Sequence, residues 1–174
     1  MLIHDRTLII RRTAVFAALA LLPTAAWSQG ANVAGTFGAW SLYTSDASGS
    51  KICFVASEPK DKKPANANRA TALLYISAWP KDGIRSEVSV KLGYPIKTPS
   101  TVTVSVGDES FKLFPKDERA YVADTTEEMK LVEALKKGST ASVAATSARG
   151  TDTTDTYSLT GVTQALQALA SNCP

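Results

Sequence analysis

The segment Thr101-Val102-Thr103-Val104-Ser105-Val106 carries the strictest alternation in this chain of 174 residues. Valines alternate with hydroxyl residues along it, and a period of two is the pattern of a half-buried β-strand. Gly107 and Asp108 follow as turn residues, and apolar positions alternate again from Ser110 to Phe114. We therefore expect two antiparallel strands joined by a tight turn, in a sheet that buries one face.

The same period recurs on both sides of this hairpin. Further strands are predicted over residues 37–44, 51–57, 71–79, 86–92, 120–122, 139–146 and 154–159. The segment 71–79 is apolar on both faces, which is typical of a central strand. The turn residues at 80–83 predict that it forms a hairpin with 86–92. Residues 58–69 are polar, contain two prolines and show no period, so a long loop is expected there.

Two segments have a helical period instead. Residues 125–137 carry a buried stripe, Thr125 and Glu128 have the spacing of a capping box, and Gly138 ends the helix. The second helix is expected at about 162–171. Many strands with short turns and two short helices predict a mainly β fold, an antiparallel β-sandwich or a partly closed barrel.

The amino-terminal residues 1–28 have the order of a secretory signal peptide. Three arginines precede an unbroken apolar run at 14–22, and small residues at 26–28 suit a cleavage site. The run is shorter than the roughly 20 apolar residues that span a bilayer, so no integral membrane span is expected. No cysteine follows the run to accept a lipid anchor. We therefore predict a cleaved, periplasmic or secreted protein that is not a lipoprotein and begins near Gln29.

Cleavage changes what the composition means. It leaves a small polar stretch at 29–35, expected to be a flexible lead-in, and a single domain over 36–174. The leader holds three Arg and one Asp, so the net charge falls from +3 to about +1. That balance lacks the basic footprint of a nucleic-acid-binding protein. The sequence favours a monomer or weak oligomer.

The two cysteines, Cys53 and Cys173, both lie outside the leader. In an oxidising compartment two cysteines are expected to form one disulfide. Cys173 follows Leu169 by one helical turn and continues the apolar stripe of the second helix, so its sulfur is expected to face the core. The alternatives are two free thiols or a bond between two chains.

The sequence contains few candidate catalytic residues. A serine or cysteine nucleophile usually needs a histidine base, and the single histidine, His4, lies in the leader. The stretches after Asp124 and Asp152 lack the glycine that an aspartic pair would use. Zinc, copper and haem sites depend on His and Cys. We therefore predict no catalytic residue, no metal site and no cofactor.

One surface is a candidate for binding a partner. Its expected members are Tyr75 and Trp79 on one strand face, with a basic group in the polar loop formed by Lys60, Lys62 and Lys63. Aromatic side chains that remain exposed supply binding energy, and lysines favour an anionic partner.

Several stretches resemble the invasion-associated locus B (IalB) proteins of Gram-negative alphaproteobacteria. They are Phe37-Gly38-Ala39-Trp40-Ser41, Cys53, Ser86-Glu87-Val88-Ser89-Val90, Gly93-Tyr94-Pro95, Asp155-Thr156-Tyr157-Ser158-Leu159-Thr160-Gly161 and Cys173. The resemblance covers residues 36–174, and its motifs are structural rather than chemical.

This resemblance implies an exported periplasmic or envelope-associated protein with no established catalytic residues. It implies a role in host-cell invasion or in envelope stress adaptation. The leader, the expected disulfide, the sheet-rich pattern and the missing catalytic groups favour a non-enzymatic protein that binds an envelope or host protein or another envelope component. Two other hypotheses stay open from the residues: a small-molecule or lipid carrier, which needs a cavity of a few hundred Å³, and a small carboxylate-dependent hydrolase, which needs convergent acids in a cleft.

Overall fold

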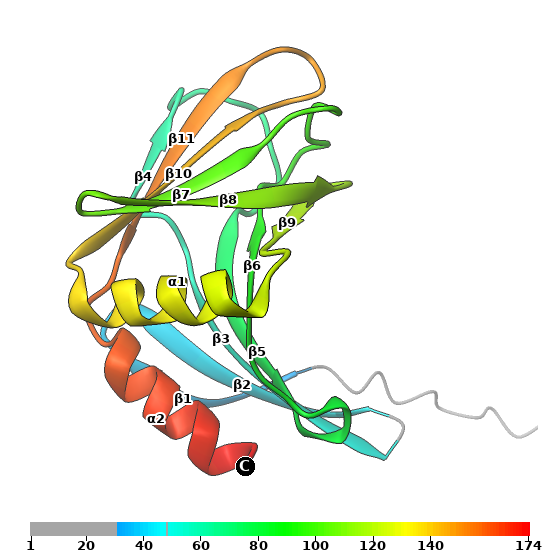
Figure 1. Ribbon diagram of the computed structural model, residues 1–174, viewed down its shortest axis with the longest axis vertical. Helices are drawn as coiled ribbons and strands as arrows, with labels where there is room; N and C mark the ends of the chain where they lie inside the picture. The colour runs from blue at the N-terminus through cyan, green and yellow to red at the C-terminus, as the bar shows by residue number, and fades with distance from the viewer. Residues whose placement is uncertain (1–30, 48) are drawn as a thin grey trace, which may run out of the picture.

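The computed structural model describes residues 31–47 and 49–174, so the predicted leader at 1–28 lies outside the described residues. This part contains eleven strands, one 3₁₀ turn and two helices (Figure 1). They are β1 (Asn32–Phe37), β2 (Trp40–Ala47), β3 (Ser50–Ser57), β4 (Asp61–Lys63), β5 (Leu73–Trp79), η1 (Pro80–Asp82), β6 (Ile84–Lys91), β7 (Val102–Val106), β8 (Glu109–Lys116), β9 (Arg119–Tyr121), α1 (Thr125–Lys137), β10 (Thr140–Thr146), β11 (Asp152–Ser158) and α2 (Val162–Asn172).

All strand pairings are antiparallel, in the order β1-β2-β3-β5-β6-β9-β8-β7-β10-β11-β4. Strand β8 joins the two halves of this order: its first part pairs with β7, and Phe114 to Lys116 pair with β9. The order ends at β1 and β4, so the sheet is not closed into a barrel. The prediction of a mainly β, antiparallel sandwich-like fold with two helices is therefore confirmed.

The strictly alternating segment, which forms β7, contributes its valines to the core. Val102 and Val104 are completely buried and Val106 nearly so, while Thr103 and Ser105 between them are only partly buried. Strand β5 lies between β3 and β6, which confirms the central position expected from its two apolar faces. Burial of these aliphatic side chains, at roughly 25 cal/mol per Å², is the main force that holds the layers together.

Helix α1 begins one residue earlier than the predicted capping box requires. The cap is Asp124, whose Oδ1 accepts from the N–H groups of Thr126 and Glu127 at 2.9 and 3.0 Å. The side chain of Glu128 instead extends to β6, where its Oε1 accepts from the Val88 N–H at 2.8 Å. Asp is a better cap than Thr, which explains the choice. Gly138 ends the helix as predicted.

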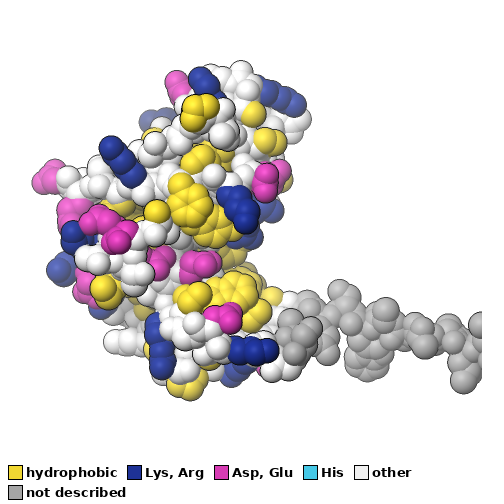
Figure 2. All heavy atoms as spheres, turned by 45° about the vertical axis from the view of Figure 1, so that its right-hand side comes forward, with side chains coloured by type: hydrophobic (Ala, Val, Ile, Leu, Met, Phe, Trp, Pro, Cys, Tyr) yellow, Lys and Arg dark blue, Asp and Glu magenta, His cyan; other side chains and the backbone are white. Residues whose placement is uncertain are grey.

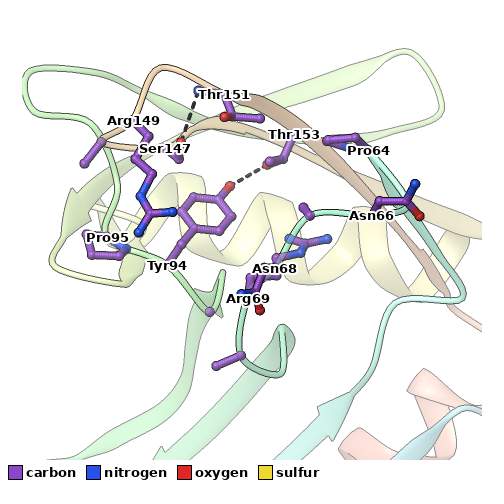
Figure 3. Close-up of a pocket in the computed structure, with 14 residues that line it drawn as sticks. Pro64, Asn66, Asn68, Arg69, Tyr94, Pro95, Ser147, Arg149, Thr151 and Thr153 are labelled. Carbon is purple, nitrogen blue, oxygen red and sulfur yellow. Dashed lines mark hydrogen bonds between the residues drawn. The ribbon is translucent and has the colours of Figure 1, made fainter.

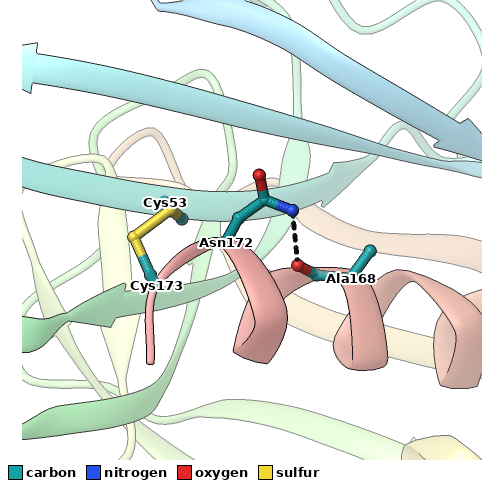
Figure 4. Close-up of a disulfide and its surroundings, with 4 residues drawn as sticks. All are labelled: Cys53, Ala168, Asn172 and Cys173. Atoms are coloured by element: carbon teal, nitrogen blue, oxygen red, sulfur yellow. Dashed lines mark hydrogen bonds between the residues drawn. A yellow bond between two sulfur atoms is a disulfide. The ribbon is translucent and has the colours of Figure 1, made fainter.

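Helix α2 packs on β2 and β3, and the disulfide closes this contact. Cys53 of β3 and Cys173 after α2 are bonded, with Cα atoms 6.0 Å apart, and both are buried (Figure 4). The expected pairing is thus present, and the described residues contain no free cysteine.

Two irregular segments were predicted wrongly in part. The lead-in at 29–35 overlaps β1, which starts at Asn32 and pairs with β2. The loop at 58–69 contains β4, whose Lys62 lies opposite Asp155 of β11 in the backbone register. Both strands lie at the edges of the sheet. They are held by backbone pairing with one neighbour rather than by burial of every second side chain. Their sequences therefore lack the period that marks the other strands.

Candidate functional site

Aromatic side chains form a continuous row on the side of the sheet that faces away from the core. The rings of Tyr43 and Phe54 stack at 4.9 Å between centroids, and Phe54 meets Tyr75 edge-on at 5.8 Å. We call this surface the aromatic face and define it by six residues: Tyr43, Phe54, Tyr75, Phe114, Arg119 and Tyr121. It lies on β2, β3, β5, β9 and β8, which follow one another in the strand order except that β6 lies between β5 and β9.

Strand register explains why these residues meet. Tyr43 is paired directly with Phe54, and Tyr75 is paired with Ser89, which in turn is paired with Tyr121. Ser89 is small and buried, and the rings of Tyr75 and Tyr121 flank it in the register. Cross-strand pairs on one face of a sheet are in contact range, so the register places the rings side by side.

A guanidinium group completes the aromatic face. Arg119 lies over the ring of Tyr75, with 4.8 Å from its Cζ to the ring centroid. Beside it, the rings of Tyr121 and Phe114 lie 5.8 Å apart, and Phe114 is 46% exposed. Arg119 takes part in none of the ion pairs of the described residues. A cation held on an aromatic ring in this way is ready to receive an acidic group.

The surface on this side is hollowed. Figure 2 looks onto the side where β8 and β9 lie in Figure 1, and it shows hydrophobic side chains gathered around a depression. Basic and acidic side chains lie next to them. Tyrosine and arginine are the residue types that contribute most to protein interfaces, so this composition suits macromolecular binding.

The structure separates the two halves of the predicted binding surface. Tyr75 lies on the aromatic face, whereas Lys62 and Lys63 lie on β4, at the far end of the strand order beside β11 (Figure 1). Lys60 precedes β4 and is exposed. The aromatic residue and the three lysines are therefore not one continuous patch along the sheet.

Trp79 lies at the end of β5, beyond a register irregularity. The register shifts between Ser77 and Trp79, and none of the aromatic pairs among the described residues includes Trp79. Its Nε1 is buried and has no hydrogen-bond partner among the described residues. Trp79 is only partly buried, like Tyr75, and it follows the buried Ala78. However, the ring in contact with Tyr75 and the cation over it come from Phe54 and Arg119.

Most of the aromatic face was not predicted from the sequence. The available signal was an aromatic residue at the outward position of a strand: Tyr43 follows the buried Leu42, and Tyr121 follows the buried Ala120. Alternation shows that such a ring points away from the core. It does not show which other strand lies next to it.

A second feature is a pocket of about 620 Å³ that shares no lining residue with the aromatic face. We call it the Tyr94 pocket, and its polar and aromatic lining includes Asn66, Asn68, Arg69, Tyr94, Arg149 and Thr153 (Figure 3). It lies between the segment after β4, the segment after β6, and the β10–β11 hairpin. These segments are loops in the strand order, which is why no periodic signal in the sequence pointed to them.

Buried polar contacts fix the inner wall of the Tyr94 pocket. The Tyr94 hydroxyl and the Thr153 hydroxyl are hydrogen-bonded, and Arg69 lies against the Tyr94 ring at 5.8 Å. Arg69 also forms a bidentate ion pair with Asp155, and its bond to that carboxylate raises the pKa of the guanidinium. Burial raises the pKa of Tyr94, so this hydroxyl is neutral and remains a hydrogen-bonding group.

Among residues 31–47 and 49–174, no cluster of three His, Cys, Asp or Glu is placed to hold a metal ion. Asp155 is engaged by Arg69, and Glu128 is engaged by the Val88 N–H. No helix in this part of the chain is long and apolar enough to cross a membrane.

Comparisons with known proteins agree with this architecture. The family model for the invasion associated locus B (IalB) protein matches residues 40–170. The crystal structure of invasion associated protein B from Bartonella henselae aligns with a TM-score of 0.58 at 19% sequence identity, over 79% of this chain and 96% of that chain. No functionally curated protein matches the chain.

The fold and its surface thus define a disulfide-bonded, antiparallel β-sandwich that offers an aromatic face and a side pocket. The chain belongs to the IalB family, whose model covers most of the sandwich from Trp40 through α2. The family resemblance read from the sequence is confirmed. Membership in an invasion-associated family and a disulfide fit an extracytoplasmic protein.

Proposed function

We propose that this chain is an exported, non-enzymatic envelope protein of the IalB type that binds another protein through the aromatic face. The main observation in support is the row of Tyr43, Phe54 and Tyr75, in which Arg119 lies over the ring of Tyr75. The partner is a protein segment with apolar and acidic side chains, because the rings offer apolar area and Arg119 offers an uncompensated positive charge.

Export is part of the same proposal. It is supported by the leader pattern at 1–28 and by the disulfide of Cys53 and Cys173, which needs an oxidising compartment. The intact mass of the protein recovered from the periplasm of producing cells is expected to correspond to a chain that begins near Gln29. A full-length protein retained in the cytoplasm would contradict export.

Site-directed photo-crosslinking tests the aromatic face. A benzoylphenylalanine is placed at Phe114, which lies on the face and is 46% exposed, or at Met129 of α1, which is 55% exposed and lies outside it. In intact cells, crosslinks to a defined protein are expected from position 114 and not from position 129. Equal products from both positions, or none from 114, would show that the face is not the binding surface.

The proposed biological role rests on the description of the family. IalB proteins are described as invasion-associated, so we propose a role in host-cell invasion or envelope stress adaptation. A strain that lacks the chain is complemented with wild type or with Arg119→Ala. Entry into host cells and growth under envelope stress are then compared. Full rescue of both properties by Arg119→Ala would show that the aromatic face is not needed for this role.

A further inference from the structure

We infer that the Tyr94 pocket binds a small organic anion with an apolar, planar body. This site shares no residue with the aromatic face, so the inference goes beyond the proposed protein binding. It gives a specific form to the carrier hypothesis, because the pocket is a side cavity of the sandwich and not the inside of a barrel.

The size of the pocket suits a small molecule. Its volume of about 620 Å³ lies within the range of roughly 300–1,000 Å³ that ligand sites occupy. Pro64, Ala67, Ala70 and Pro95 supply apolar wall, and the Tyr94 ring lies in the middle of the view in Figure 3. Since the Tyr94 hydroxyl is held by Thr153, the ring is fixed in place and offers a flat surface for stacking.

The charge of the lining favours an anion. Two arginines, Arg69 and Arg149, belong to the described lining, and no aspartate or glutamate does. Asp155, behind the wall, neutralises Arg69 through two hydrogen bonds. Arg149 takes part in none of the ion pairs of the described residues, is exposed, and lies beside Tyr94 and Pro95 in Figure 3. It is therefore the group that meets the ligand's negative charge.

The wall is rigid enough to be preformed. Gly93, one of the lining residues, has a φ of +75°, and a Cβ there would lie 2.1 Å from the Ala70 carbonyl oxygen. The Ala70 N–H donates to the Gly93 carbonyl at 3.0 Å, which joins two walls of the pocket. On the third wall, the Ser147 Oγ accepts from the Thr151 N–H at 3.1 Å and closes the hairpin that carries Arg149. A preformed pocket binds with a smaller ordering cost.

Two fluorescent probes test the inference on the full exported protein. The anion is 8-anilinonaphthalene-1-sulfonate, and the neutral counterpart is N-phenyl-1-naphthylamine. Arg149→Gln is expected to weaken binding of the anion about fivefold, the size of one exposed charge-assisted contact, and to leave the neutral probe unchanged. Arg85→Gln, at an exposed arginine of β6 outside the pocket, is the matched control and is expected to change neither.

A second variant locates the binding. Ala148 is exposed and lines the pocket, so Ala148→Trp is expected to block both probes without lowering the melting temperature. Probe affinities that Ala148→Trp leaves unchanged, or an equal loss of anion affinity in Arg149→Gln and Arg85→Gln, would overturn the inference. Neither result bears on the aromatic face, because Ala148, Arg149 and Arg85 are not part of it.

Discussion

Arg69 and Asp155, which are 86 positions apart in the sequence, form a buried bidentate ion pair. Arg69 Nη1 donates to Asp155 Oδ2 at 2.8 Å, Nη2 donates to Oδ1, and Nη1 also donates to the Leu92 carbonyl at 3.4 Å. The two side chains are only 4% and 0% exposed. The pair ties the segment after β4 to the middle of β11, and it thereby holds one wall of the Tyr94 pocket.

Loss of one member of this pair is expected to be severe. Arg69→Met should lower the free energy of unfolding by about 3–5 kcal/mol, because it leaves the buried carboxylate of Asp155 unpaired. The double variant Arg69→Met/Asp155→Leu removes both charges and should recover a large part of this loss. Urea unfolding of the three proteins measures both effects. A double variant as unstable as the single one would contradict the account.

The disulfide is the second long-range tie. Cys53→Ser should lower the melting temperature and leave the thiol of Cys173 open to alkylation. The bond closes a loop with a sequence separation of 120 residues, for which the chain-entropy model gives on the order of 5 kcal/mol as an upper value. Thermal unfolding and mass spectrometry after alkylation check both parts. Full alkylation of the unreduced wild type would show that the bond does not form.

Tyr157, which is buried, and Tyr94, which is partly buried, are expected to respond differently to loss of the hydroxyl. Tyr157 is buried, and its hydroxyl has no hydrogen-bond partner among the described residues, so Tyr157→Phe should leave stability unchanged or raise it by up to about 1 kcal/mol. Tyr94→Phe loses the bond to Thr153 and should cost about 1 kcal/mol. Chemical denaturation of both variants gives the comparison, and the reverse order would refute it.

The amino-terminal cap of α1 predicts different effects for substitutions at the neighbouring residues Asp124 and Thr125. Asp124→Ala should destabilise the protein by about 1 kcal/mol, because two helix N–H groups lose their acceptor. Thr125→Ala, one position further on, should cost much less because the side chain of Thr125 caps neither group. Circular dichroism during thermal unfolding measures both. A larger effect at Thr125 would restore the capping box predicted from the sequence.

Glu128 gives the protein a pH-dependent contribution to stability. Burial raises the pKa of this carboxyl, the bond from the Val88 N–H opposes the shift, and the neighbouring Glu87 adds to it. A group with a raised pKa binds its proton more tightly in the folded state. Stability is therefore present below the ordinary pKa and is lost as the pH rises through the higher, folded-state pKa.

Replacement of Glu128 tests this sign. The melting temperature of Glu128→Gln relative to wild type should increase as the pH is raised from about 4 to about 7, since the amide does not ionise. Glu109→Gln, at an exposed glutamate, is the control and should follow the wild type. A difference between Glu128→Gln and wild type that shrinks with rising pH would have the wrong sign.

Much of the fold was predictable, because its signals are local. Alternation at Val102, Val104 and Val106 identified a strand and its buried side, and the helical period identified α1 within its observed bounds. The edge strands were not predictable in the same way. β1 and β4 contain few buried apolar residues, so they lack the alternation that marks the inner strands.

The candidate site was predictable only in part. Tyr75 was identified as an outward aromatic residue, and the structure places it on the aromatic face. Its neighbours Phe54 and Arg119 come from other strands, and their sequence positions carry no mark of that proximity. The Tyr94 pocket was not predicted at all, because loops form its walls.

The sequence by itself determined which residues face the core, where the helices lie, and the family to which the chain belongs. Those properties follow from the spacing of residue types along the chain, which does not depend on contacts with distant segments. Only the tertiary structure decided that Arg69 meets Asp155 and that Arg119 lies on Tyr75. Such contacts depend on strand order and register, which are set by the packing of the whole sandwich rather than by any single segment.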